Sequence, residues 1–152
     1  MSRSDGLRAL AEKVQALAGP CRETDAVVAL AVGWTRHVYK YREAMDGADR
    51  ETHIFDREDI SWVGPKGHRL TIFPPTFTAS LDASMSLVDL SVFEGCLLQG
   101  PMMGNGLWSA EVDGIQGDAA TPALALTAAA LRALVAEYRR GSYERAGGRD
   151  AG

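Results

Sequence analysis

The chain has too few cysteine and histidine residues to be organised by disulfides or by a bound metal ion. It contains 2 cysteines and 3 histidines. Two cysteines cannot form a disulfide framework, and neither residue type shows the spacing of metal ligands. The candidate metal ligands are His37, His53 and His68 with Asp56 or Asp59, and no pair among them has that spacing. We therefore expect reduced thiols at Cys21 and Cys96, with Cys96 buried in a strand, and neither a metal nor a cofactor.

The chain also lacks a basic excess and a long apolar run. Its net charge of -4 argues against binding a nucleic-acid polymer, which needs a basic face. The longest strongly apolar run, 123–136, is broken by Thr127 and Arg132 and is shorter than the roughly 20 residues of a membrane span. The first residues lack the apolar core of a secretion signal. These absences predict a protein of the cytosol with no membrane segment.

Hydrophobic residues make up 46% of the 152 residues, which is sufficient for one cored domain. Apolar spacing predicts amphipathic helices over 7–17 and 26–32 that pair as a hairpin. A third helix is expected from Thr78, burying Leu81, Met85 and Val88, and a fourth from Thr121 to about Arg140, capped by Gly141. Segments 90–98 and 107–112 are predicted to form a β-hairpin. The alanine-rich face of the fourth helix is expected in the core, with a subunit contact as the alternative.

Between the second and third helices the apolar periodicity is lost. Residues 35–61 alternate charges with aromatics, which we interpret as a long, solvated connection. Residues 61–70 indicate two short extended pieces joined by the turn Gly64-Pro65-Lys66-Gly67. The expected organisation is one domain over 1–141, with an insertion at about 36–60 and a disordered tail at 142–152.

Several short motifs together resemble a family of small phage and prophage proteins, the phage ABA sandwich domain. The resemblance lies in residues 7–17, 19–26, 62–65, 77–83 and 120–126. It implies the α+β class, with a small antiparallel sheet covered by helices on both faces in an α-β-α sandwich, and a gene of phage origin. It implies no family-wide activity. Cys21 departs from the polar capping residue of many relatives, and 36–60 matches no pattern of the family.

One constellation has the chemistry of an anion site. The candidate ligand-binding residues are Trp62, Lys66, His68, Arg69, Thr78, Ser80 and Asp82. Trp62 would stack on a base, the basic residues would neutralise phosphate, and the helix start would add hydroxyl and amide donors. The alternative interpretation, which needs no ligand, is a surface turn beside a half-buried tryptophan.

Three hypotheses of function follow. The first is a phage-encoded, homo-oligomeric and non-enzymatic protein that sequesters a small nucleotide-like anion, to counter host antiviral signalling. The second is a protein–protein module that docks on a host or phage partner through the 36–60 insertion. The third is a small hydrolase that uses Asp82 or Glu94 with His68, although Ser80 lacks the strained turn of a serine nucleophile.

Overall fold

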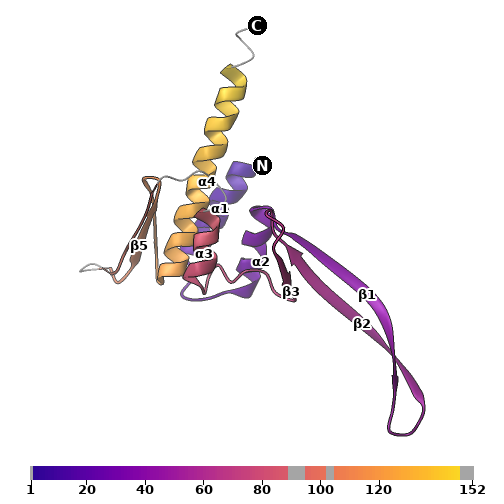
Figure 1. Ribbon diagram of the computed structural model, residues 1–152. Helices are drawn as coiled ribbons and strands as arrows, with labels where there is room; N and C mark the ends of the chain where they lie inside the picture. The colour runs from indigo at the N-terminus through magenta and orange to yellow at the C-terminus, as the bar shows by residue number, and fades with distance from the viewer. Residues whose placement is uncertain (1, 89–94, 102–104, 148–152) are drawn as a thin grey trace. The chain divides into compact units, whose positions relative to one another are not determined.

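The structure is a computed structural model that describes residues 2–88, 95–101 and 105–147, with side chains through 141. In order, its elements are α1 (Arg3–Gln15), α2 (Arg22–Ala31), β1 (Thr35–Asp46), β2 (Thr52–Val63), β3 (Arg69–Thr71), α3 (Leu81–Val88), β4 (Cys96–Gln99), β5 (Trp108–Val112), β6 (Ile115–Ala119) and α4 (Pro122–Gly147) (Figure 1). The chain divides into two compact units. The helical unit comprises residues 1–28 and 76–152, and the ribbon unit comprises residues 29–75.

The predicted α+β class is confirmed. The described strands form two antiparallel three-stranded sheets, in the orders β1-β2-β3 and β4-β5-β6, where the resemblance implied a single sheet. On one face of β5 and β6 the residues Ala110, Val112, Gly117 and Ala119 are buried, whereas Glu111 and Gln116 on the other face are exposed. This alternation gives the β4-β5-β6 sheet one face toward α4 and one polar face.

Helix α4 is the centre of the helical unit. It packs against α1, α3, β5 and β6, and every residue from Ala123 to Leu131 is buried. The expected core role of its alanine face is therefore confirmed. Thr121 caps the helix as predicted, because its Oγ1 accepts the N–H of Leu124 at 3.2 Å. The helix does not end near Arg140 but continues through Gly141 to Gly147, since 142–147 include the helix-favouring residues Glu, Arg and Ala.

The start of α3 was predicted wrongly. The helix begins at Leu81 rather than Thr78, and its buried residues are Ser84, Leu87 and Val88. Leu81 and Met85, expected in the core, are exposed. The shift arises because Thr78 is bonded to other residues. Its N–H donates to Asp25 of α2, and its hydroxyl accepts the N–H of Cys21, which precedes α2.

Helix α1 is confirmed, although it begins at Arg3 and ends at Gln15 instead of spanning 7–17. Ser2 is the N-cap and forms a capping box with Asp5, and Leu7, Leu10, Ala11 and Val14 are buried. The principal partner of α1 is α4 rather than α2, so the predicted helical hairpin is not the main contact.

Strand β6 was not predicted, because Ile-Gln-Gly-Asp-Ala has little apolar content. Its glycine explains how it packs. A Cβ on Gly117 would lie 2.6 Å from the backbone N of Ala129 and 2.7 Å from the carbonyl O of Ala125. The strand therefore lies directly against the backbone of α4, where the helix also has small side chains.

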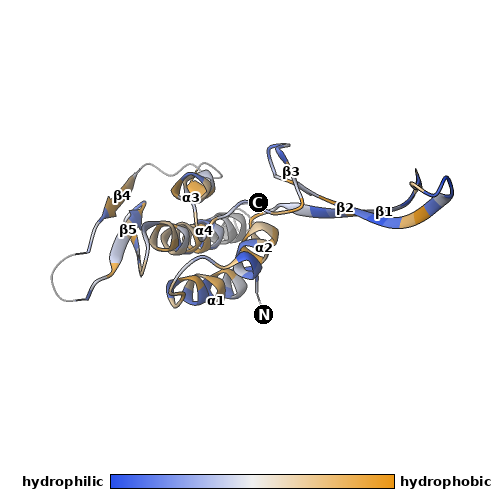
Figure 2. Cartoon of the chain, turned by 90° about the horizontal axis from the view of Figure 1, so that it is seen from below, coloured by the Kyte–Doolittle hydropathy of each residue, from blue (hydrophilic) through white to orange (hydrophobic). Residues whose placement is uncertain are grey.

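The largest difference from expectation lies in the ribbon unit. Residues 35–61 are not a loop but most of a two-stranded ribbon, in which Thr35–Asp46 pairs with Thr52–Val63 throughout. Hydrophobic and hydrophilic residues follow one another along both strands (Figure 2). Most of these residues are exposed, as predicted for the segment. The predicted turn at 64–67 is confirmed by the Gly67 N–H, which donates to the Gly64 carbonyl at 3.0 Å.

Candidate functional site

The residues predicted to bind an anion are divided between the two units. Trp62, Lys66, His68 and Arg69 lie in the ribbon unit, whereas Thr78, Ser80 and Asp82 lie in the helical unit. Lys66 is in the turn after β2, His68 precedes β3 and Arg69 begins it, and all three are exposed. They retain the exposed basic character that the sequence indicated.

Two of the predicted residues have structural tasks instead. Trp62 is only 3% exposed, so its ring faces are not open for stacking, and its indole N–H has no hydrogen-bond partner among the described groups. Thr78 is fully buried. Its hydroxyl accepts the Cys21 N–H at 2.8 Å and donates to the Cys21 carbonyl at 3.3 Å. The hydroxyl of Thr78 therefore joins two segments of the helical unit and is not available to a ligand.

The same buried contact includes an acid. The Thr78 N–H donates to Asp25 Oδ1 at 2.7 Å, and Asp25 is 2% exposed. Burial raises the pKa of Asp25, and the hydrogen bonds from Thr78 partly oppose this. Asp25 was not singled out from the sequence, because an acid in the first turn of a helix is usually solvated.

The residues of the hydrolase hypothesis are divided between the two units, and one lies outside the described residues. The Ser80 Oγ accepts the N–H of Ala83 at 3.3 Å and so caps α3, while Asp82 is exposed in the first turn. His68 belongs to the other unit, and Glu94 lies outside the described residues.

Metal and thiol chemistry would depend on where the histidines and cysteines lie. Within residues 2–88, 95–101 and 105–147, no group of three or more His, Cys, Asp or Glu is placed to hold a metal ion. Both cysteines are free thiols, as predicted, but Cys96 is exposed rather than buried. Cys21 precedes α2, and the hydroxyl and N–H of Thr24 lower its pKa.

The most distinctive surface of the described chain is one face of the β1–β2 ribbon. Because facing residues alternate, His37, Tyr39, Tyr41, Glu43 and Met45 share a face with the partners of those residues on β2. We call this the aromatic face. Its members are His37, Tyr39, Tyr41, Glu43 and Met45 of β1 and His53, Phe55, Arg57, Asp59 and Ser61 of β2. Tyr39 is 60% exposed and Phe55 is 46% exposed, so large aromatic side chains lie open to solvent on this face.

Contacts within the aromatic face order its side chains. His37 stacks on Tyr39 at 6.5 Å, and the Arg57 guanidinium lies 5.7 Å from the centre of the Phe55 ring. Arg57 Nε also donates to Glu43 Oε2 at 3.0 Å. Local burial, together with the charges of Asp59 and Glu43, raises the pKa of Tyr41, so its hydroxyl is neutral near pH 7. The face thus combines exposed aromatic rings with ionisable side chains, of which Arg57 and Glu43 are paired with each other.

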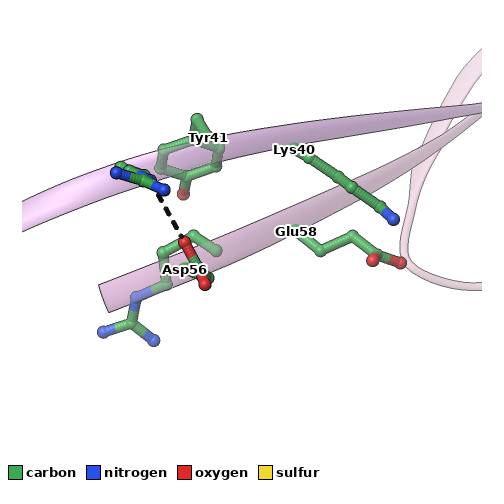
Figure 3. A pocket seen from close by; sticks show the side chains of 6 residues that line it. Lys40, Tyr41, Asp56 and Glu58 are labelled. Atoms are coloured by element: carbon green, nitrogen blue, oxygen red, sulfur yellow. Dashed lines mark ion pairs between the residues drawn. The ribbon is translucent and has the colours of Figure 1, made fainter. Parts of the chain in front are cut away.

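The opposite face of the ribbon has a different chemistry. Lys40 and Arg42 of β1 lie across from Glu58 and Asp56 of β2, and Arg42 Nε is 3.5 Å from Asp56 Oδ1 (Figure 3). An open hollow of about 530 Å³ along the ribbon is lined by these four residues together with Tyr41 and Arg57 of the aromatic face. Cross-strand pairs of opposite charge fix the register and keep this face hydrated.

The ribbon also has open edges. In the order β1-β2-β3, β1 is an edge strand, and β3 pairs only with Ser61, Trp62 and Val63 of β2. Among the described residues, therefore, the outer side of β1 and most of the outer side of β2 offer unpaired backbone groups. Such edges are able to accept a further strand.

Comparisons with known proteins add no assignment: no family model, curated protein or solved structure matches the chain. The resemblance to the phage sandwich family stays a prediction. Within the described part of the chain, no helix has the length and apolar content required to span a membrane.

Proposed function

We propose that this chain is a non-enzymatic protein-interaction module that binds through the β1–β2 ribbon, and that the partner is a second copy of the chain. The observation that carries the proposal is the aromatic face, where Tyr39, Tyr41 and Phe55 stand exposed on a ribbon of two 12-residue strands. Aromatic side chains anchor protein interfaces, and two-stranded ribbons gain stability when one face is covered.

A second copy suits this face because of its charges. Glu43 is paired with Arg57 inside the ribbon, and the Tyr41 hydroxyl is neutral, which leaves Asp59 as the remaining acid of the aromatic face. Two such faces meet with little like-charge repulsion, and their rings supply apolar area to both partners. A strand edge left open beside the face permits additional backbone pairing.

The sequence-based hypotheses retain different amounts of support. The second hypothesis, docking through 36–60, is the one that the exposed ribbon favours, with the partner now a second copy instead of a host or phage protein. Sequestration of a nucleotide-like anion by Trp62 and Thr78 has no support from their burial. Phage origin, an anti-defence role and location in the cytosol stay predictions.

The test is the mass of the purified full chain in solution, measured by sedimentation over about 1 to 100 µM, the range in which weak dimers dissociate. One variant carries Tyr39→Ser with Phe55→Ser on the aromatic face. The matched control carries Val38→Ser with Ile54→Ser, which removes exposed apolar side chains from the neighbouring positions of the opposite face.

We expect a reversible dimer whose dissociation constant rises at least about tenfold in the Tyr39/Phe55 variant and changes little in the control. A wild-type chain that remains monomeric over the whole range contradicts the proposal. Equal weakening by the two variants contradicts it as well, because the aromatic face would then have no special part.

A further inference from the structure

A groove in the helical unit gathers arginine side chains that the proposed ribbon interface does not use. It lies between α1 and α4 and has a volume of about 520 Å³. The residues that line it are Arg8 and Glu12 of α1 with Arg132, Val135, Ala136, Arg139 and Arg140 of α4. The volume falls in the range of pockets that hold small organic ligands.

The sequence builds this groove from two helical spacings. Arg8 and Glu12 are one turn apart on α1, and Arg132, Val135 or Ala136, and Arg139 occupy successive turns of α4. The two helices pack along Leu7, Leu10 and Val14, which are buried. The arginines therefore stand along the rim of a helix–helix contact, and the buried Val135 contributes an apolar floor.

Arg132 is the fixed member of the group. Its Nη1 donates to the Gln116 carbonyl at 2.9 Å, and its Nη2 donates to Gln15 Oε1. Both acceptors are uncharged, so the guanidinium is held in place while its positive charge is not neutralised. Among the described side chains, no ion pair involves Arg8, Arg132 or Arg139.

The acids near the groove offset only part of its positive charge. Glu12 lines it, and Asp113 pairs with Arg140 at 3.6 Å through exposed side chains. Asp5 is engaged in hydrogen bonds from Ser2, which with the charges of Arg8 and Arg139 lower its pKa. The lining residues alone comprise four arginines and one glutamate, a formal charge of +3.

We propose that the groove binds a small organic molecule with two anionic groups, phosphoryl or carboxylate, joined by an apolar middle. Guanidinium groups match both kinds of anion with paired hydrogen bonds. Arg132 and Arg139 are seven residues apart on α4, a separation of about 10 Å along the helix axis. A single anionic group reaches only one of these two arginines, so a second group is needed to bind the other. The middle of the ligand then lies over Val135 and Ala136.

Calorimetric titration of the full chain tests this inference. The probes are suberate, with two carboxylates on an apolar chain, 1,6-hexanediol bisphosphate, with two phosphoryl groups on an apolar chain, and inorganic phosphate as the single-group reference. Arg132→Gln and the more exposed Arg139→Gln remove the charge. Arg69→Gln, an exposed arginine of the ribbon unit, is the matched control.

We expect at least one of the two-group probes to bind with a dissociation constant below about 1 mM, and more tightly than phosphate. Each groove variant should weaken that binding at least about tenfold, and the Arg69 control should not. The inference is overturned if neither two-group probe binds, if phosphate binds equally well, or if Arg69→Gln has the same effect as the groove variants. The Tyr39/Phe55 variant should bind the probe like the wild type, so this test and that of self-association fail separately.

Discussion

Individual buried polar residues fix how the segments of the helical unit pack against one another. Thr78 offers its hydroxyl to Cys21 and its N–H to Asp25, and the Ser84 hydroxyl lies 2.8 Å from the Phe77 carbonyl and 3.0 Å from Thr127 Oγ1. Three of these four contacts join segments far apart in the sequence, and the bond from Ser84 to Phe77 joins α3 to the segment just before it. Buried polar groups that are all paired specify geometry more sharply than apolar contacts do.

Asp25 gives a prediction with a defined pH dependence. Its pKa is raised above the ordinary value of 3.8, so the folded chain holds this proton more strongly than the unfolded chain. The contribution of Asp25 to the free energy of unfolding should fall as pH rises from about 3.8 through the raised pKa and then level off. The difference between wild type and Asp25→Asn, from urea denaturation at several pH values, should show this fall.

The hydrogen bond of Asp25 is tested by a second substitution. Asp25→Ala leaves the buried Thr78 N–H without an acceptor, and we expect a loss of about 1 to 3 kcal/mol in the free energy of unfolding at pH 7. Asp25→Asn retains an acceptor and should cost less. A pH-independent difference for Asp25→Asn, or a larger loss for it than for Asp25→Ala, would refute this account of the contact.

At the level of elements, the sequence was most informative where apolar residues recur at helical spacing. Helices α1 and α4 could be predicted because Leu7, Leu10 and Val14, and the apolar run after Thr121, mark them clearly. The start of α3 could not, because the use of Thr78 depends on Asp25, 53 positions away. Long-range partners of this kind leave no local signal.

Strands were harder to predict than helices. The segment 35–61 has aromatic and β-branched residues at alternate positions, a strand signal, but its charges favoured a solvated loop. In the ribbon these charges face one another across the strands, Lys40 opposite Glu58 and Arg42 opposite Asp56, so they are compatible with a strand. The buried state of Trp62 also depends on folding that the sequence did not reveal. The groove between α1 and α4 was missed because its arginines come from opposite ends of the chain.

The packing of β6 on α4 gives a prediction at the scale of elements. A Cβ on Gly117 would meet backbone atoms of α4 at 2.6 and 2.7 Å, which only a shift of the strand relieves. Gly117→Ala should therefore reduce the free energy of unfolding by about 1 to 3 kcal/mol. Gly6→Ala in α1, where a Cβ meets nothing within 4 Å, should raise it by about 0.5 to 1 kcal/mol. Chemical denaturation of both variants measures these changes. A Gly117→Ala variant with an unchanged free energy of unfolding would be inconsistent with this close approach.

At the scale of the whole molecule, we assign a different role to each unit: self-association to the ribbon unit and ligand binding to the helical unit. The helical unit contains α1, α3, α4 and β4 to β6 and most of the buried apolar residues, whereas the ribbon unit exposes most of its residues. An exposed ribbon of this length adds little to a core. In our proposal its exposed aromatic face contacts another chain.

This division predicts that the ribbon can be shortened without loss of the helical unit. Replacing residues 39–59 by Asn-Gly joins Val38 to Ile60, which already face each other, through a tight turn. Trp108 lies in the helical unit and reports on its unfolding. The denaturant concentration at which the helical unit is half unfolded should change little in this variant, while self-association is lost. A large fall in that concentration would show that the helical unit depends on the ribbon.

The central claim is that the aromatic face contacts a second copy, and a photocrosslink reads that contact directly. With p-benzoylphenylalanine in place of Tyr41, irradiation of the purified chain should give a product of twice the chain's mass, attached within residues 35–63 of the other copy. The same group in place of Lys40, on the opposite face, should give far less. Absence of the product from the Tyr41 position, or equal yields from the two positions, would contradict the account.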